Sequence, residues 1–184
     1  MAKLSDKKVA ILITDGVEEV ELMEPAKALR MEGADVIVAS PGGGEVQVMR
    51  HDEKTMKANS QMKTADIQAS EFDAVMLPGG TMNGDRLRMD EDARRFVRDM
   101  DAAGKPIAAI CHAPWLLVSS GLARGRTLTS YFTLQDDIRN AGGNWVDEET
   151  VVDHNLLTSR SPADIPAFNQ KMLEIFAGIP QPAR

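Results

Sequence analysis

Ile107-Ala-Ala-Ile-Cys-His-Ala-Pro114 is the stretch that decides how this chain folds. Its first four residues are all apolar, which is typical of a short strand buried on both faces of a parallel sheet. Residues 113–120 then have the composition of a helix, and Gly121 is suited to end it. A strand that passes so directly into a helix predicts a sharp turn, with Cys111 at its apex.

The same alternation of strand and helix runs outward in both directions. Short apolar runs predict strands at Val9-Ala-Ile-Leu-Ile13, Val36-Ile-Val-Ala39, Ala74-Val-Met-Leu77, Thr127-Leu-Thr129, Val151-Val152 and Leu156-Leu157. Helical spacing predicts helices over residues 17–32, 85–103, 134–141 and 163–176. Residues 45–72 are polar and irregular, and predict short strands or a hairpin at the edge of the sheet. This order indicates one doubly wound α/β domain over residues 1–184, around a mainly parallel sheet.

Composition narrows the classes of function. The 184 residues carry a net charge of −7, with 43% hydrophobic and 27% charged residues. An acidic chain of this kind argues against a nucleic-acid or membrane partner, because both favour a basic patch. No apolar run approaches the roughly 20 residues that cross a bilayer. The polar N-terminus and the single cysteine fit a reducing cytoplasm.

Three loops are the candidate site, because ligands of doubly wound folds bind at the carboxyl ends of the strands. These loops are Asp15-Gly-Val-Glu-Glu19, Pro78-Gly-Gly80 and Cys111-His112. Cys111 stands at the start of a helix, where free backbone N–H groups favour the nucleophilic thiolate. The competing interpretation is a buried structural cysteine, which is commoner among cysteines in general.

Several neighbours could assist the sulfur. Glu18 or Glu19 could direct a carboxyl group at it, although both also suit the first turn of a helix. Gly79 and Gly80 allow close backbone approach, and an N–H there could form an oxyanion hole with that of His112. A turn that needs positive φ explains this glycine pair equally well.

The histidines limit the mechanism. His112 adjoins the cysteine and is the best candidate base, but no acid that would orient it is evident nearby. His51 lies in the irregular segment and is expected to be exposed, while His154 follows a late strand. One cysteine and three scattered histidines give no metal-ligand spacing, and no dinucleotide fingerprint follows the first strand. We therefore expect no cofactor.

In combination these pieces resemble the ThiJ/PfpI superfamily. The matching stretches are Asp15-Gly-Val-Glu-Glu-Val-Glu-Leu22, Leu77-Pro-Gly-Gly80, Asp85-Arg-Leu-Arg88, Ala109-Ile-Cys-His-Ala-Pro114, Thr129-Ser-Tyr131, and Thr158-Ser-Arg160 through Pro166-Ala-Phe168. The resemblance implies a flavodoxin-like three-layer sandwich related to class I glutamine amidotransferases. It is greatest to the PfpI-type branch of intracellular proteases and general stress proteins.

The resemblance also implies roles for single residues. Cys111 would be the nucleophile and Glu18 the carboxyl bonded to its sulfur, with oxyanion N–H groups from Gly80 and His112. Gly79 and Tyr131 would line the substrate site. Asp85 of a neighbouring subunit would orient His112, which implies at least a homodimer with its sites near the interface. Asp85 stands where the archaeal pattern has Glu, in a loop one residue longer.

Three functions follow from this arrangement as hypotheses. The first is a cofactor-free, cysteine-dependent stress-protection enzyme of the glyoxalase or deglycase kind, acting on reactive carbonyl compounds such as methylglyoxal. The second is an intracellular peptidase that uses Cys111, His112 and Asp85 as an intersubunit triad. The third is a redox-responsive stress protein without enzymatic activity, in which Cys111 is oxidised to a sulfinic acid.

Overall fold

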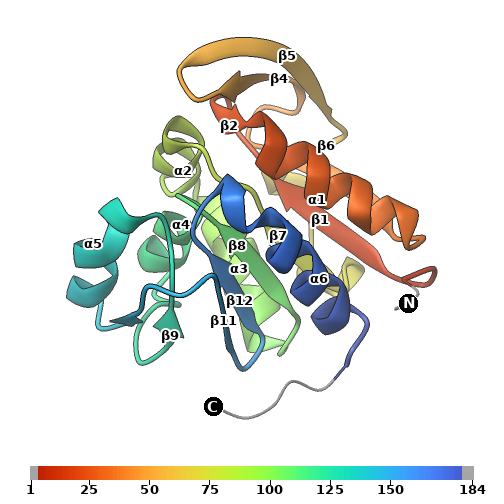
Figure 1. The fold of residues 1–184 in the computed structure, drawn as a ribbon. Coiled ribbons are helices and arrows are strands. Elements are labelled where there is room, and N and C mark those ends of the chain that lie inside the picture. The colour runs from red at the N-terminus through yellow and green to blue at the C-terminus, as the bar shows by residue number, and fades with distance from the viewer. Residues whose placement is uncertain (1–3, 180–184) are drawn as a thin grey trace.

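A seven-stranded sheet forms the centre of the computed structural model, which describes residues 4–179 (Figure 1). Neighbouring strands are parallel except at β11, which pairs antiparallel with β12. In spatial order the strands are β11 (Thr150–Asp153), β12 (Leu156–Ser159), β8 (Ile107–Ile110), β7 (Ala74–Leu77), β1 (Lys8–Leu12), β3 (Asp35–Ser40) and β6 (Met62–Lys63). The predicted mainly parallel, doubly wound sheet is confirmed.

Helices cover both faces of this sheet and make three layers. Helices α1 (Glu19–Met31) and α6 (Ile165–Phe176) pack on the face that carries Val9 and Ile11 of β1. Helices α3 (Glu91–Ala102) and α4 (Pro114–Ser119) pack on the opposite face, against Ala10 and Leu12. Successive side chains of a strand point to opposite faces, so this short apolar run supplies both cores.

Smaller elements surround the sandwich. The irregular segment predicted as an edge hairpin is β4 (Gly44–Arg50) and β5 (Glu53–Ser60), which join β2 (Val17–Glu18) in a second sheet. Figure 1 shows this hairpin near the N-terminal end of α1, on the same side as β2. The remaining elements are α2 (Thr81–Leu87), α5 (Gln135–Asn140), β9 (Thr127–Leu128), β10 (Asn144–Trp145) and four 3₁₀ turns, at Thr64–Asp66, Ala69–Glu71, Phe132–Leu134 and Pro162–Asp164.

Two predicted helices have different bounds in the structure. The single helix expected over residues 85–103 is two helices, because the Asp90 carboxylate accepts a hydrogen bond from the Ala93 N–H and starts α3 anew. The first helix begins at Glu19 and not at Val17, because Val17 and Glu18 pair with β4. Within residues 4–179, no helix is long and apolar enough to cross a membrane.

The three predicted loops meet at one edge of the sheet. The buried Asn83 side chain accepts from the Thr14 N–H at 2.7 Å and donates to the carbonyl oxygens of Pro78 and Gly79. It therefore ties the loop after β1 to the loop after β7. The Glu18 N–H donates to the same Gly79 carbonyl at 3.2 Å. Cys111, directly after β8, lies beside this junction.

Candidate active site

Cys111 occupies the sharp turn that the sequence predicts. Its φ is +63°, a left-handed conformation that residues other than glycine seldom adopt. The Cys111 N–H donates to the Ser159 carbonyl at 3.0 Å, and the Cys111 carbonyl accepts from the Tyr131 N–H at 2.8 Å. Strained backbone held by its surroundings in this way is characteristic of functional sites.

The sulfur is less exposed and less acidic than the sequence suggests. Cys111 is only 6% exposed, and this burial, together with the negative charge of Glu21, raises the pKa of its thiol. The backbone N–H groups of Gly80 and His112 hydrogen-bond to the sulfur and lower that pKa. The expected N–H donors are therefore in place, but desolvation outweighs them and the resting group is a thiol. The predicted low pKa was wrong, because a helix start alone says nothing of the depth of burial.

Glu21 is the carboxyl that reaches the sulfur. It is the third residue of α1. Its side chain is fully buried and hydrogen-bonds to the Cys111 thiol. Its Oε2 also accepts from the Gly79 N–H at 2.9 Å. Burial, with a smaller contribution from the charge of Glu18, raises the pKa of Glu21 to about 8. Near neutral pH the group is therefore mainly a neutral acid, which can share its proton with the sulfur.

The assignment of this role to Glu18 is corrected by the structure. Glu18 Oε2 accepts from the backbone N–H of His51 at 2.9 Å, so its carboxylate faces the β4–β5 turn. Glu19 pairs with Arg50 at the surface. Residues 17 and 18 form a strand and Glu19 starts the helix, so that neither Glu18 nor Glu19 is directed at the sulfur.

Helical spacing contains the signal for Glu21. The buried residues of α1 are Glu21, Leu22, Pro25, Ala26 and Leu29, which recur three and four apart. Val20 and Met23 of the same helix are apolar but lie outside this stripe, and they are 36% and 42% exposed. An acidic residue in phase with the buried stripe of a helix is costly unless it is neutral or paired, and so marks a site.

His112 lies on the other side of the sulfur. Its Nδ1 is 3.2 Å from Cys111 Sγ, and its Nε2 is 3.4 Å from Thr81 Oγ1. The imidazole stacks on the Tyr131 ring at 4.6 Å between centroids. Burial lowers the pKa of His112 to about 4, so the ring is neutral near pH 7. With its Nε2–H directed at Thr81, it can accept the thiol proton at Nδ1.

Close packing explains the Pro-Gly-Gly turn. A Cβ atom on Gly79 would lie 2.3 Å from Glu21 Oε2 and 2.6 Å from Cys111 Cβ. Gly80 has a φ of +100°, and a Cβ there would lie 2.3 Å from the Gly16 carbonyl oxygen. The positive φ expected of this turn is found at Gly80, and Gly79 gives the acid and the sulfur room to meet.

A pocket of about 500 Å³ opens onto these groups. Its lining residues come from all three loops and from the β4–β5 turn: Glu18, Glu21, Met49, His51, Asp52, Gly80, Thr81, Met82, Cys111, His112, Tyr131 and Pro162. No lysine or arginine from residues 4–179 is among them. Size and charge both suit a small neutral or cationic ligand.

Comparison with known proteins agrees with this geometry. The sequence profile of the DJ-1/PfpI family matches residues 7–175. The chain belongs to the DJ-1/PfpI family. It is 40% identical to "Protein/nucleic acid deglycase 2" of Escherichia coli over 170 residues, 92% of this chain and 97% of that protein. It is 38% identical to "Putative cysteine protease YraA" of Bacillus subtilis over 169 residues, 92% of this chain and 98% of that one.

A solved structure of the DJ-1/PfpI family shares the fold. This is a two-domain protein of Anabaena variabilis with DJ-1/ThiJ/PfpI-like and ferritin-like domains, 38% identical, with a TM-score of 0.85. The match covers 91% of this chain and 47% of that one, so the chain spans about half the length of the two-domain protein. The predicted superfamily and the flavodoxin-like fold are confirmed.

Asp85, the acid that the family resemblance assigns to His112, does not contact that residue within one chain. It is exposed on α2, whereas the His112 Nε2 faces Thr81. A role for Asp85 at the His112 of a neighbouring subunit stays a prediction.

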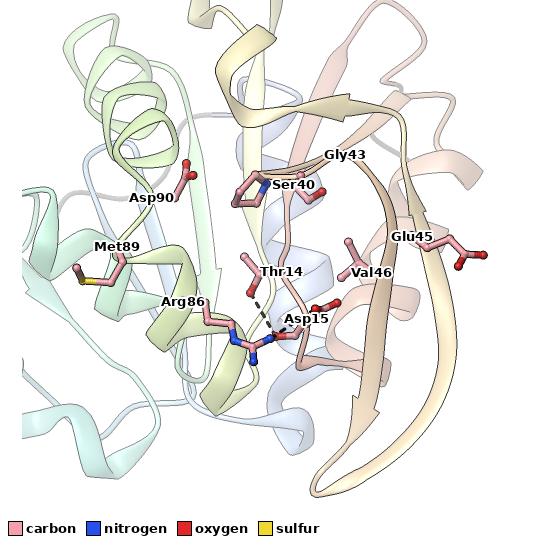
Figure 2. Close-up of a pocket in the computed structure, with 11 residues that line it drawn as sticks. Thr14, Asp15, Ser40, Gly43, Glu45, Val46, Arg86, Met89 and Asp90 are labelled. Carbon is pink, nitrogen blue, oxygen red and sulfur yellow. Dashed lines mark hydrogen bonds and ion pairs between the residues drawn. The ribbon is translucent and has the colours of Figure 1, made fainter.

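A second pocket, of about 450 Å³, lies at the carboxyl ends of β1 and β3 and differs in chemistry. Figure 2 shows Thr14, Asp15 and Arg86 on one of its sides, with Ser40 and Gly43 across from them. Arg86 is bound to Asp15 through its carboxylate at 3.6 Å and its carbonyl at 3.3 Å. Among residues 4–179, neither a thiol nor an imidazole lines this pocket. The pocket at Cys111 therefore differs from it in having both groups in its lining.

Proposed function

We propose that this chain is a thiol-dependent enzyme that acts on small reactive carbonyl compounds, with methylglyoxal as the simplest substrate. The observation that carries the proposal is that four groups surround one sulfur. A neutral acid, a neutral imidazole and two backbone N–H groups all lie next to Cys111 Sγ. The deglycase name of the Escherichia coli relative supports the same class of chemistry.

The first step is addition of the sulfur to the aldehyde carbon. His112 Nδ1 takes the thiol proton as the C–S bond forms, and returns it to the new oxyanion to give a neutral hemithioacetal. The N–H groups of Gly80 and His112, which hydrogen-bond to the sulfur in the free enzyme, are positioned to stabilise that oxyanion. Glu21 hydrogen-bonds to the sulfur as a neutral acid and so avoids a second negative charge in the pocket.

A proton shift and hydrolysis complete the reaction. His112 removes the C–H proton from the carbon that bears sulfur and delivers it to the neighbouring carbon, which converts the hemithioacetal to a thioester of lactate. Water then cleaves the thioester, so that one methylglyoxal and one water give one lactate and the free thiol. Proton NMR of the reaction mixture tests this directly: lactate should accumulate with wild-type protein and not with Cys111→Ala.

A peptidase is the second candidate, because the Bacillus subtilis relative bears a cysteine protease name. It would use the same sulfur and imidazole, with Asp85 from a second copy of the chain. Two exposed apolar side chains support a second copy on this face: Met82, 45% exposed, lines the same pocket as His112, and Phe132, 59% exposed, packs against Tyr131. Cleavage of an unstructured peptide that is lost in both His112→Ala and Asp85→Asn would favour this candidate over the carbonyl enzyme.

A redox role needs the same sulfur. If Cys111 instead serves as a peroxide sensor, mild peroxide should add two oxygen atoms to it without any turnover of methylglyoxal. Mass spectrometry of treated protein separates this outcome from the two enzymatic candidates.

A further inference from the structure

The turn between β4 and β5 is held in an unusual conformation at the mouth of the catalytic pocket. His51 has a φ of +56°, a left-handed conformation that is less favourable for a residue with a side chain than for glycine. Arg50 pairs with Glu53, so His51 and Asp52 alone form the connection between the strands. A glycine or asparagine would satisfy such a turn more easily, so the histidine needs a separate explanation.

Glu18 fixes this turn from the catalytic side. Its side chain is only 7% exposed, and its Oε2 accepts from the His51 N–H at 2.9 Å across 33 positions of the chain. A buried carboxylate requires such a partner. Because Glu18 immediately precedes the helix that carries Glu21 to the sulfur, the position of His51 is tied to that of the catalytic carboxyl.

His51 and Asp52 line the same pocket as Cys111 and His112. His112 is itself buried beneath Tyr131 and directed at the sulfur. His51 is exposed, and its imidazole has no hydrogen bond to any residue between 4 and 179. The pocket therefore has one imidazole committed to the nucleophile and a second one free to meet a ligand.

His154 has the same backbone conformation as His51 but does not line the catalytic pocket. It has a φ of +55° in the turn between β11 and β12. Its ring is bound by the Asp153 carboxylate. This turn lies at the start of β12, where Leu156 is level with Ile107, at the end of the sheet opposite Cys111. Both histidines have positive φ in a hairpin turn. Among residues 4–179, the His154 ring has a hydrogen-bond partner and the His51 ring has none.

We propose that His51 is a second acid and base that faces the substrate in this pocket. The inference rests on the proposed carbonyl chemistry and deepens it. When His112 removes the C–H proton of the hemithioacetal, the neighbouring ketone oxygen must gain a proton. Protonated His51 donates that proton and gives an enediol. As His112 returns its proton to the second carbon, His51 takes the proton of the hydroxyl on the sulfur-bearing carbon, and both imidazoles regain their starting state.

The carboxyl groups that line the pocket with His51 come from the packed elements and from its own turn. They are Glu18 and Glu21 from β2 and α1, and Asp52 within the turn, while Arg50 is directed to Glu19. Cys111, His112 and Tyr131 complete the titratable lining.

His51→Asn and His51→Gly test the inference, since asparagine and glycine both tolerate positive φ. The matched control is His154→Asn. Turnover of methylglyoxal is measured across pH 5–9, together with the rate at which iodoacetamide alkylates Cys111. We expect both His51 variants to lower kcat by about 100-fold, the size of a general acid–base contribution, with little change in KM. The rate of Cys111 alkylation in both His51 variants, and the turnover of the control variant, should stay at wild-type values.

Glu18 gives a second arm, because it acts on His51 through the backbone. Glu18→Ala should reproduce the His51 defect in kcat, and Glu18→Gln, which keeps the acceptor oxygen, should recover most of the kcat lost in Glu18→Ala. If wild type and His154→Asn are active through Cys111 and both His51 variants match them within twofold, the inference is wrong and the proposed function stands. If wild type does not turn over methylglyoxal, both are overturned.

Discussion

Replacing Glu21 with glutamine should change how the stability of the protein depends on pH. Glu21 is fully buried, no cationic side chain of residues 4–179 forms an ion pair with it, and its pKa rises from 4.5 to about 8 on folding. The folded state therefore binds more protons than the unfolded state between these two pKa values. Since the free energy of unfolding falls with pH wherever the native state holds the extra proton, Glu21 stabilises the protein at low pH and this contribution is lost as pH rises toward 8.

The size of the effect follows from the shift. At about 1.36 kcal/mol for each pKa unit, the contribution of Glu21 should decline by on the order of 4 kcal/mol between pH 5 and pH 8. Glutamine has nearly the same shape and does not titrate. The free energy of unfolding of Glu21→Gln, relative to wild type, should therefore rise by that amount across the interval and level off above pH 8.

Urea denaturation followed by tryptophan fluorescence, in the presence of a reductant, measures this difference at each pH. Glu24→Gln is the matched control, because Glu24 is an exposed glutamate of the same helix, and its profile should run parallel to that of wild type. If the profiles of wild type and Glu21→Gln are also parallel, Glu21 does not hold a proton at neutral pH and the description of the site is wrong.

Three further outcomes follow from the structure. Asn83→Ala should lower the free energy of unfolding by about 2–3 kcal/mol, because it leaves the buried Thr14 N–H without its acceptor, and urea denaturation measures this. Gly79→Ala should separate Glu21 from Cys111, since the added methyl group cannot share their space; we expect carbonyl turnover to fall below detection, and wild-type activity would show that the close approach is unnecessary. Because the pKa of His112 is about 4, protonation of this base should not limit kcat/KM above pH 5, and a pH–rate profile that assigns a limb there to His112 would contradict its burial.

The fold could be predicted well because each strand carries its own signal. Runs such as Val9-Ala-Ile-Leu-Ile13 are apolar at every position, so both faces of the strand must be buried. A sheet covered by helices on both sides buries them. The rule that ligands bind at the carboxyl ends of the strands then located Cys111, His112 and the glycine turn. These residues follow their strands immediately, so their positions at the edge of the sheet depend little on the exact ends predicted for the strands.

The carboxyl partner could not be located in that way, because its position depends on where a helix begins. Had the helix started at Val17, Glu18 would lie in its first turn; the pairing of Glu18 with β4 moves the start to Glu19 and places Glu21 inward. The role of His51 depends on a hydrogen bond between residues 33 positions apart, for which local sequence holds no signal. The depth of the sulfur likewise depends on packing between loops that are distant in sequence.

Turnover of methylglyoxal by Cys111→Ala, beside wild type at equal concentration, tests the central claim most directly. Alanine differs from cysteine only in lacking the thiol group. The variant therefore keeps the backbone turn and removes only the nucleophile. We expect lactate formation to drop to the rate of the reaction without protein. Lactate formed at the wild-type rate by the variant would show that the sulfur is not the reacting atom, and the proposed chemistry would be contradicted.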